Sequence, residues 1–208
     1  MPPSRRGPVT ADELKKELED RYRNDPVYKA SVDRQEAEHR SRHEELRRAE
    51  RPLVAALQSA GIPVDSAWEL YKYPELGETA YPLLLEHLRR DYPDRILNGI
   101  ARAFTKDVAR RHWQELLSIY LSDGRPEVRD GLAATLSDCA VRTHFDDLIA
   151  IVENQDLGET RIYFLRPVNR IGNRMSAGGG RKVIERFAND PQLGTEANRI
   201  LKGRGRND

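Results

Sequence analysis

The sequence offers few groups with the spacing of a catalytic centre. Nucleophile motifs such as Gly-x-Ser-x-Gly are missing. His39 and His43 stand four residues apart on an expected helix, a spacing that can direct two imidazoles at one metal ion. The intervening residues include arginines and lack the glutamate of the metalloprotease motif, so we interpret the pair as part of a solvated face. The sequence therefore predicts a protein that is not an enzyme and has no metal site and no cofactor.

Other residues with possible chemistry are interpreted as structural. Cys139, the single cysteine, falls in an apolar helical pattern and is expected to be a small buried hydrophobe. The glycines at 178–180 precede a helix start, as in anion-binding loops, but the Lys-Ser/Thr of a phosphate loop is absent. We expect the segment from Gly172 to Gly180 to be a flexible loop. Three histidines are interpreted as packing or capping residues: His87, His112 and His144.

Arginines form the most informative constellation. Arg102 and Arg166 lie 64 residues apart, which is two periods of the repeat described below. Arg129 and Arg161 are likewise equivalent in the repeat, and Arg170 corresponds to Lys106. These positions lie off the apolar stripe of the second helices, so they could form a basic ridge. Such a ridge would suit an acidic protein surface or a phosphate backbone. The alternative is an ordinary solvated face, with ion pairs to residues such as Asp130 and Glu159. The predicted partner-binding residues are Arg102, Arg129, Arg161, Arg166, Arg170 and Arg174.

The charge of the whole chain does not favour nucleic acid or an anionic membrane, because 35 Lys and Arg balance 34 Asp and Glu. The segment from Leu157 to Asp208 differs, with 11 Lys and Arg against 5 Asp and Glu. This last quarter is the only part with a basic bias. No run of apolar residues approaches the 18 needed for a spanning helix.

The elements that would position these arginines follow from a repeat of 32 residues. Apolar residues recur at this interval in three registers: Ile96, Val128 and Thr160; Ile100, Leu132 and Phe164; Phe104, Leu136 and Val168. Such a period is typical of helical hairpins that bury their apolar faces by stacking. Small residues beside the stripe, such as Gly131 and Ala101, would allow close helix approach. The expected helix pairs are 79–90 with 93–105, 112–121 with 126–138, 145–153 with 158–169, and 180–188 with 193–201. Before them, a helix should end at Gly61, and the pattern around Trp68 indicates a packing residue. Pro167 should kink the second helix of the third pair.

The N-terminal quarter has a different pattern. Thr10 and Glu13 match a capping box, and Pro26 should end the helix that follows. The next run, 27–49, is almost wholly polar and predicts a long exposed helix. We therefore divide the chain into a disordered tail (1–9), an N-terminal helical arm (10–50), an α-solenoid (51–202) and a second disordered tail (203–208).

The segment from Asp123 to Ala134, DGRPEVRDGLAA, closely resembles the inter-helix turn and second helix of HEAT repeats. The chain is similar to a group of uncharacterised bacterial HEAT-like proteins with a polar N-terminal helix. The resemblance implies an all-α fold, a right-handed α-α superhelix of HEAT-like hairpins preceded by the polar arm. It also implies a concave face, lined by the second helices, that binds proteins or, in some branches, nucleic acid.

These observations predict a non-enzymatic interaction scaffold that binds a protein or peptide partner through the concave face. The alternative is a nucleic-acid-binding protein, similar to the HEAT-like DNA glycosylases, that uses the basic C-terminal part. A third possibility is an enzyme similar to HEAT-like bilin lyases, but no residue of the sequence supports it. We expect a cytoplasmic protein, from the single cysteine and the absence of a secretory signal at the start. The oligomeric state is open, and the arm could mediate dimerisation.

Overall fold

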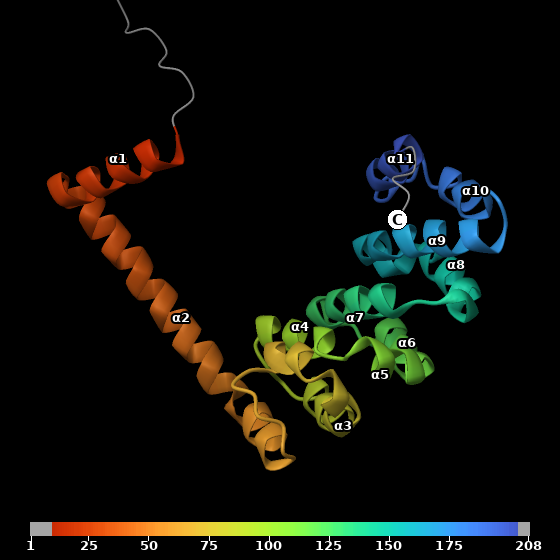
Figure 1. Ribbon diagram of the computed structural model, residues 1–208, viewed down its shortest axis with the longest axis horizontal. Helices are drawn as coiled ribbons and strands as arrows, with labels where there is room; N and C mark the ends of the chain where they lie inside the picture. Colours follow the sequence, from red (N-terminus) through yellow and green to blue (C-terminus); the bar gives the residue numbers. More distant parts are fainter. Residues whose placement is uncertain (1–9, 204–208) are drawn as a thin grey trace, which may run out of the picture. The chain divides into compact units, whose positions relative to one another are not determined.

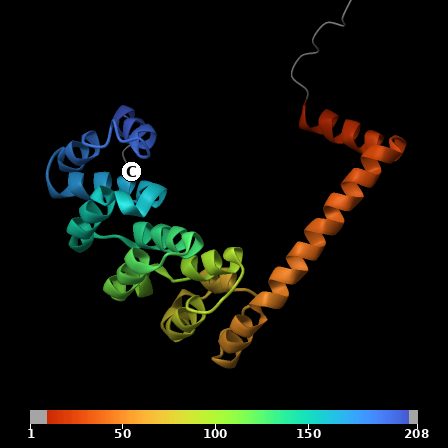
Figure 2. The same ribbon diagram turned by 180° about the vertical axis from the view of Figure 1, so that it is seen from behind.

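The computed structural model describes residues 10–203, and this part of the chain is helical without any strand. The all-α prediction is confirmed. Two compact units are present, Met1–Arg48 and Ala49–Asp208, which we call unit 1 and unit 2 (Figure 1, Figure 2). The tails predicted to be disordered lie outside the described residues, except for Gly203.

Unit 1 begins with a helical hairpin. Helix α1 spans Ala11–Asn24 and α2 spans Pro26–Ser59. The predicted capping box is confirmed, since the Thr10 hydroxyl accepts from the Glu13 backbone and the Glu13 carboxylate accepts from the Thr10 backbone. Between the helices, the Asp25 carboxylate accepts hydrogen bonds from the backbone N–H groups of Val27 and Tyr28, both at 3.0 Å. It thereby caps the first turn of α2.

Helix α2 runs on through Pro52 into unit 2. Its polar face ends where Leu53 and Leu57 become fully buried. The helix stops at a Schellman motif: Ile62 N–H donates to Leu57 O and Gly61 N–H donates to Gln58 O, both at 3.0 Å. Gly61 has φ +83°, as expected for the residue after a helix end.

Unit 2 consists of short helices joined by tight turns. The four expected helix pairs are present, with ends shifted by a few residues, and α5 was not expected. The bounds are η1 Ala67–Lys72, η2 Pro74–Leu76, α3 Gly77–Leu88, α4 Asp94–Arg102, α5 Lys106–Arg111, α6 Trp113–Ser122, α7 Pro126–Cys139, η3 Arg142–His144, α8 Phe145–Glu153, η4 Gln155–Arg161, α9 Ile162–Met175, α10 Gly179–Glu185 and α11 Gly194–Lys202.

The core of unit 2 is built from the repeat positions. Ile100, Leu132 and Phe164, on α4, α7 and α9 respectively, are all fully buried. Helix α4 packs on α7, α7 on α9, and α9 on both α10 and α11. Close approach of α4 and α7 depends on Gly131, because a Cβ there would lie 2.5 Å from the Cβ of Ala101. The predicted use of small residues between these two helices is confirmed.

The predicted loop from Gly172 to Gly180 was wrong. Helix α9 continues to Met175 and α10 starts at Gly179, so only 176–178 are non-helical. A Cβ at Gly172 would lie 2.6 Å from the Cα of Gly180. These glycines therefore allow two helices to touch, a use of glycine that composition cannot distinguish from loop flexibility. Helix α9 also continues through Pro167, and the expected kink there stays a prediction.

The structural interpretations of the histidines and the cysteine agree with the structure. The ring of His144 stacks on Trp113 with centroids 3.8 Å apart, and the His87 ring hydrogen bonds with the Tyr92 hydroxyl at 2.6 Å. Cys139 is fully buried, and burial raises the pKa of its thiol to about 11, which leaves it unreactive at neutral pH. His39 and His43 are both exposed.

Candidate binding groove

A groove with a volume of about 940 Å³ is lined by residues of α5, α7, α9 and α11 of unit 2. We call it the basic groove. It owes its position to the stacking of the second helices, whose side chains beside the buried stripe face it. Its charged lining consists of Lys106, Arg166, Arg170 and Arg199 with Asp138 and Glu196. Four cations against two carboxylates give the lining a net charge of +2.

One carboxylate holds two of the arginines. Glu196 Oε1 accepts from Arg166 Nε at 2.9 Å and lies 2.7 Å from Arg166 Nη2. Glu196 Oε2 accepts from Arg199 Nη1 at 3.0 Å. The Glu196 side chain is only 11% exposed, while those of Arg166 and Arg199 are 69% and 70% exposed. A single buried charge therefore orients two guanidinium groups whose remaining N–H donors face solvent.

The other two cations of the basic groove, Lys106 and Arg170, have one carboxylate between them, Asp138. Lys106 Nζ lies 3.0 Å from Asp138 Oδ2, and both side chains are well exposed. Arg170 donates to the backbone oxygen of Ala140 at 3.4 Å. Among residues 10–203 it has no carboxylate partner within ion-pair distance. In the part of the chain that the structure describes, Arg170 is thus the cation of this groove that makes no ion pair.

A second cavity, of about 530 Å³, shares Lys106 and Asp138 with the basic groove and so continues it. Its floor includes Phe104, and its edge carries Trp68 and Tyr71 from η1, which are 48% and 75% exposed. We call Trp68 and Tyr71 the aromatic shelf. Arg110 adds a further cation to this cavity.

The aromatic shelf is held in place by the start of η1. Ser66 accepts a hydrogen bond from the Trp68 backbone and donates to the Glu50 carboxylate at 2.9 Å. Glu50 also accepts from the Ala67 backbone at 2.8 Å. The edge of the Trp68 indole lies against Gly99 of α4, where a Cβ would come within 2.8 Å of Nε1. The sequence pattern had indicated a packing role for Trp68, whereas half of the side chain is exposed.

Arg102 lies beside the shelf within a polar network. Its guanidinium donates to Asp130 at 2.8 Å, to Asn98 at 2.9 Å and to the Tyr163 hydroxyl at 3.1 Å. Burial raises the pKa of Asp130, but the hydrogen bonds from Arg102, Tyr163 and Asn98 outweigh it, so the pKa is lowered overall. Asp130 therefore stays ionised, and it neutralises Arg102 in the way the solvated-face alternative expected.

The structure brings together only some of the six predicted arginines. Arg102, Arg166 and Arg170 line the two cavities. Arg174 is exposed but lines neither of them. Arg129 is half-buried and donates to Asp123 O at 3.0 Å, while its Nε is buried without a partner in the described structure.

Arg161 is an interior residue. It is only 2% exposed, so the structure gives it no surface on which to meet a partner. Its guanidinium donates to Gly158 O at 3.0 Å, Val152 O at 3.0 Å and Gln192 Oε1 at 2.7 Å, and it pairs with Asp190 at 3.3 Å. These contacts join η4 to the end of α8 and to the turn between α10 and α11. Position in the repeat had suggested equivalence with Arg129, but a repeat of 32 residues does not fix which way a long side chain turns.

Sequence reasoning missed several groups of the two cavities. Lys106 had been noted only as the repeat equivalent of Arg170, and Arg199 belongs to the last helix pair, which is out of phase with the others. Tyr71 carried no signal, because an exposed aromatic and a buried one look alike in sequence.

The groove presents hydrogen-bond donors and positive charge, which suits it to an anionic ligand. Within residues 10–203, no three His, Cys, Asp or Glu side chains are grouped so that they could hold a metal ion. No helix in the same range is both long and apolar enough to cross a bilayer. Comparison with protein-family models, curated proteins and solved structures finds no match to this chain.

Proposed function

We propose that the protein is a non-enzymatic interaction scaffold whose basic groove binds an extended acidic segment of a protein partner. In this proposal unit 2 is a HEAT-like α-solenoid with a right-handed superhelical course, and the groove occupies its concave face. The stacking of α4, α7 and α9 and the 32-residue repeat support this architecture.

The observation that carries the proposal is the excess of cations in the groove. Arg166 and Arg199 share the single carboxylate of Glu196, and Arg170 has no carboxylate partner among residues 10–203. A glutamate- or aspartate-rich segment would supply the missing anions without displacing Glu196. Binding would be strongest at low ionic strength, because the arginine heads are exposed to solvent and salt screens their charge.

The test compares two charge-reversal variants of the full chain. Arg166→Glu with Arg170→Glu changes the groove, while Arg95→Glu with Arg142→Glu makes the same change in net charge at exposed positions that line neither cavity. Each is used to capture partners from the native cell, with mass spectrometry as the readout. We expect the groove variant to lose proteins that wild type and the control variant retain. An unchanged captured set would overturn the assignment of the groove.

A direct measurement complements the capture. Fluorescence anisotropy of a labelled peptide of about ten glutamates should rise on adding wild type, with an affinity that falls as salt is raised. The groove variant should bind at least about tenfold more weakly, since two attractive contacts become repulsive. Equal affinities for the two double variants would mean that binding reflects net charge alone.

A second candidate function is the binding of single-stranded nucleic acid, and the aromatic shelf is the observation that favours it. Exposed aromatic rings beside cations are what sequence-independent binders use to stack bases and hold phosphates. Lys106 and Arg110 lie in the same cavity as Trp68 and Tyr71. In this alternative the basic groove would carry the phosphate backbone.

Tryptophan fluorescence separates the two functions. Of the two tryptophans, Trp113 is 3% exposed, so quenching by an oligonucleotide would report stacking on Trp68.

Fluorescence anisotropy measures the binding itself. A labelled 20-nucleotide single strand and its duplex are titrated with the protein at low salt and again with rising salt. Flat anisotropy for both at every salt concentration would exclude this function. Binding by wild type that is lost in Trp68→Ala would support it.

A further inference from the structure

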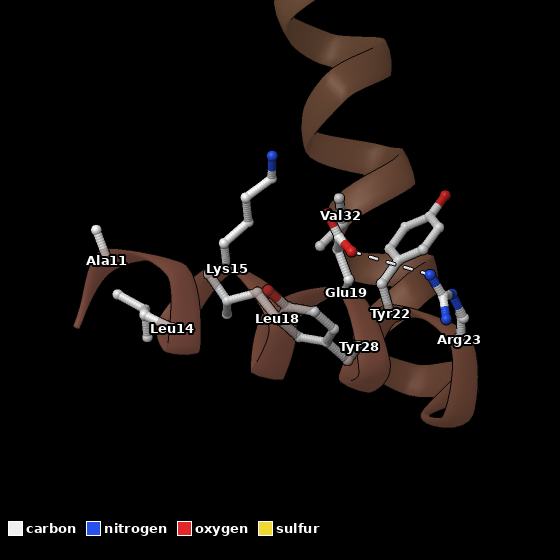
Figure 3. Close-up of a pocket in the computed structure, with 9 residues that line it drawn as sticks. All are labelled: Ala11, Leu14, Lys15, Leu18, Glu19, Tyr22, Arg23, Tyr28 and Val32. Atoms are coloured by element: carbon white, nitrogen blue, oxygen red, sulfur yellow. Dashed lines mark ion pairs between the residues drawn. The ribbon is translucent and has the colours of Figure 1, made fainter. Parts of the chain in front are cut away.

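Unit 1 carries an apolar surface that its own helices leave uncovered. No residue of α1 is buried. Leu14 and Leu18 are 50% and 43% exposed, although they follow one another at helical spacing on one face. Together with Tyr28 and Val32 of α2 they line a cavity of about 490 Å³ (Figure 3). We call this surface the hairpin face.

The hairpin face is preorganised. The Tyr22 hydroxyl donates to Asp33 Oδ1 at 2.5 Å, tying α1 to α2. The Arg21 guanidinium lies 4.4 Å from the centre of the Tyr28 ring, a cation–π distance. With the Asp25 cap described above, these contacts fix the turn between the helices. A partner would therefore bind a surface that is already ordered, so binding would not carry the entropic cost of ordering it.

Charged side chains flank the apolar stripe in an alternating order. Lys15, Glu19 and Arg23 of α1 line the same cavity, with Glu19 and Arg23 forming an ion pair (Figure 3). If two α1 helices pack antiparallel about a two-fold axis near Lys16, Leu14 of one copy meets Leu18 of the other. In that register Lys15 lies opposite position 17 of the other copy, and Glu19 is two residues, or about 3 Å of helix rise, farther along, within reach of the long lysine side chain. The face is thus complementary to itself, as an isologous contact requires.

We infer that the hairpin face is a self-association surface, covered by the hairpin face of a second copy of this chain. The two hairpins then form a short antiparallel four-helix arrangement in which the leucines are buried and two Lys15–Glu19 pairs close the rim. This surface lies in unit 1 and is independent of the groove proposed to bind a partner.

The size of the face sets the strength of the dimer. Helix α1 has 14 residues, which gives a length of about 21 Å, and two adjacent helices present a width of roughly 20 Å. The contact is then about 400 Å² per copy, or roughly 800 Å² in total, below the ~1,200 Å² of stable complexes. We therefore expect a weak dimer that dissociates in the micromolar range.

The first test is sedimentation velocity of the full chain from about 1 to 500 µM. The mean sedimentation coefficient should rise from monomer to dimer across this range. Leu14→Gln with Leu18→Gln should weaken association by at least about tenfold, since it removes the apolar centre of the contact. Val27→Gln is the matched control, because Val27 is 80% exposed on the same hairpin but does not line the cavity, and it should dimerise like wild type. A wild-type monomer at every concentration would overturn the inference.

The second test asks whether Lys15 and Glu19 pair between copies. Lys15→Glu alone places glutamate opposite Glu19 of its partner, and Glu19→Lys alone places lysine opposite Lys15, so each variant should self-associate several-fold more weakly than wild type. Mixed together, the two variants should form a heterodimer, because both opposing pairs are then of opposite charge. Helix content is checked by circular dichroism. Because mixing cannot repair a defect within one chain, failure of the mixture to associate would overturn the proposed pairing.

Discussion

Units 1 and 2 both contain helices with apolar residues four positions apart, but these residues are exposed in the unit 1 helix and buried in the unit 2 helix. In α1, Leu14 and Leu18 stand four residues apart; in α4, Ile96 and Ile100 do the same. Leu18 is 43% exposed, whereas Ile100 is fully buried. The local pattern is equal, so the difference comes from what lies next along the chain. Helix α4 is followed 32 residues later by α7, which covers it, while α1 has only the first turns of α2.

This contrast shows that the sequence of an amphipathic helix determines which of its faces is apolar. It does not determine which other element packs against that face. Unit 2 supplies the cover from its own repeat. Its interior is tightly packed, and Gly131 of α7 lies so close to Ala101 of α4 that a larger side chain would not fit. In unit 1 the helices are held mainly by caps, hydrogen bonds and cation–π contacts at the turn. Changes in unit 2 should therefore affect stability far more than equivalent changes in unit 1.

The largest effect is expected for Leu132→Ala, at the centre of the unit 2 core. Leu132 is fully buried on α7, and truncation leaves a cavity that the neighbouring helices cannot close. The free energy of unfolding should fall by about 2–5 kcal/mol, measured by reversible urea denaturation. Leu121→Ala is the control, because Leu121 is 46% exposed, and it should cost less than ~1 kcal/mol. Similar losses for the two variants would contradict the core placement of Leu132.

Arg161→Ala should come next, with a loss of about 3 kcal/mol. Removal of the guanidinium leaves Asp190 Oδ2 and the backbone oxygen of Val152 without their Arg161 donor in a buried setting. Arg174→Ala, at an exposed arginine of the same predicted set, should change unfolding by less than ~0.5 kcal/mol. If Arg161→Ala also changed the free energy of unfolding by less than ~0.5 kcal/mol, the interior position of Arg161 would be contradicted.

A smaller effect is expected from pH. Burial lowers the pKa of His87 and His144, so the unfolded chain takes up protons at a higher pH than the native state. Their contribution to stability is present above the unfolded pKa of about 6.5 and is lost as pH falls below it. At pH 5.5 each histidine should account for at most about 1.4 kcal/mol of lost stability.

Urea denaturation at pH 7.5 and 5.5 measures this loss. His144→Gln should show a smaller difference between the two pH values than wild type. His39→Gln, at an exposed position, should keep the wild-type difference. If His144→Gln kept it as well, the buried histidine would not be a source of the pH dependence.

The smallest effect is expected for Leu18→Ala in α1. It is the same substitution as at Leu132, but its side chain is 43% exposed. At a protein concentration well below the expected dimer dissociation constant, unfolding of unit 2 should change by less than ~0.5 kcal/mol. A loss comparable with that of Leu132→Ala would mean that α1 is part of the core, and the contrast between the units would fail.

Much of the helical layout could be predicted from sequence, because it follows from local rules. The capping box at Thr10, the helix end at Gly61 and the four helix pairs of unit 2 each depend on neighbouring residues. The prediction of a flexible loop from Gly172 to Gly180 failed, because glycine occurs both in loops and where two helices touch. Here the glycines at 172 and 180 form a contact between α9 and α10. The extra helix α5 lacked a recognisable start or stop signal.

The candidate groove was predictable only in part. Arg166 and Arg170, four residues apart on the exposed side of α9, both line the groove, in agreement with the predicted set. Position in the repeat could not reveal that Glu196 would hold Arg166 and Arg199 together, because that contact crosses between α9 and α11. Nor could it separate Arg161, which turns inward to Asp190, from Arg166, which turns outward.

The sequence alone determined that residues 10–203 are helical, where most of these helices lie to within a few residues, and which face of each is apolar, since hydrogen bonds and side-chain periodicity act over a few residues. Only the tertiary structure decided which apolar faces are buried, which arginines reach the surface and which carboxylates neutralise them. Those outcomes depend on contacts between residues about 30 positions apart, and the direction taken by a long, flexible side chain is set by the partner it finds there.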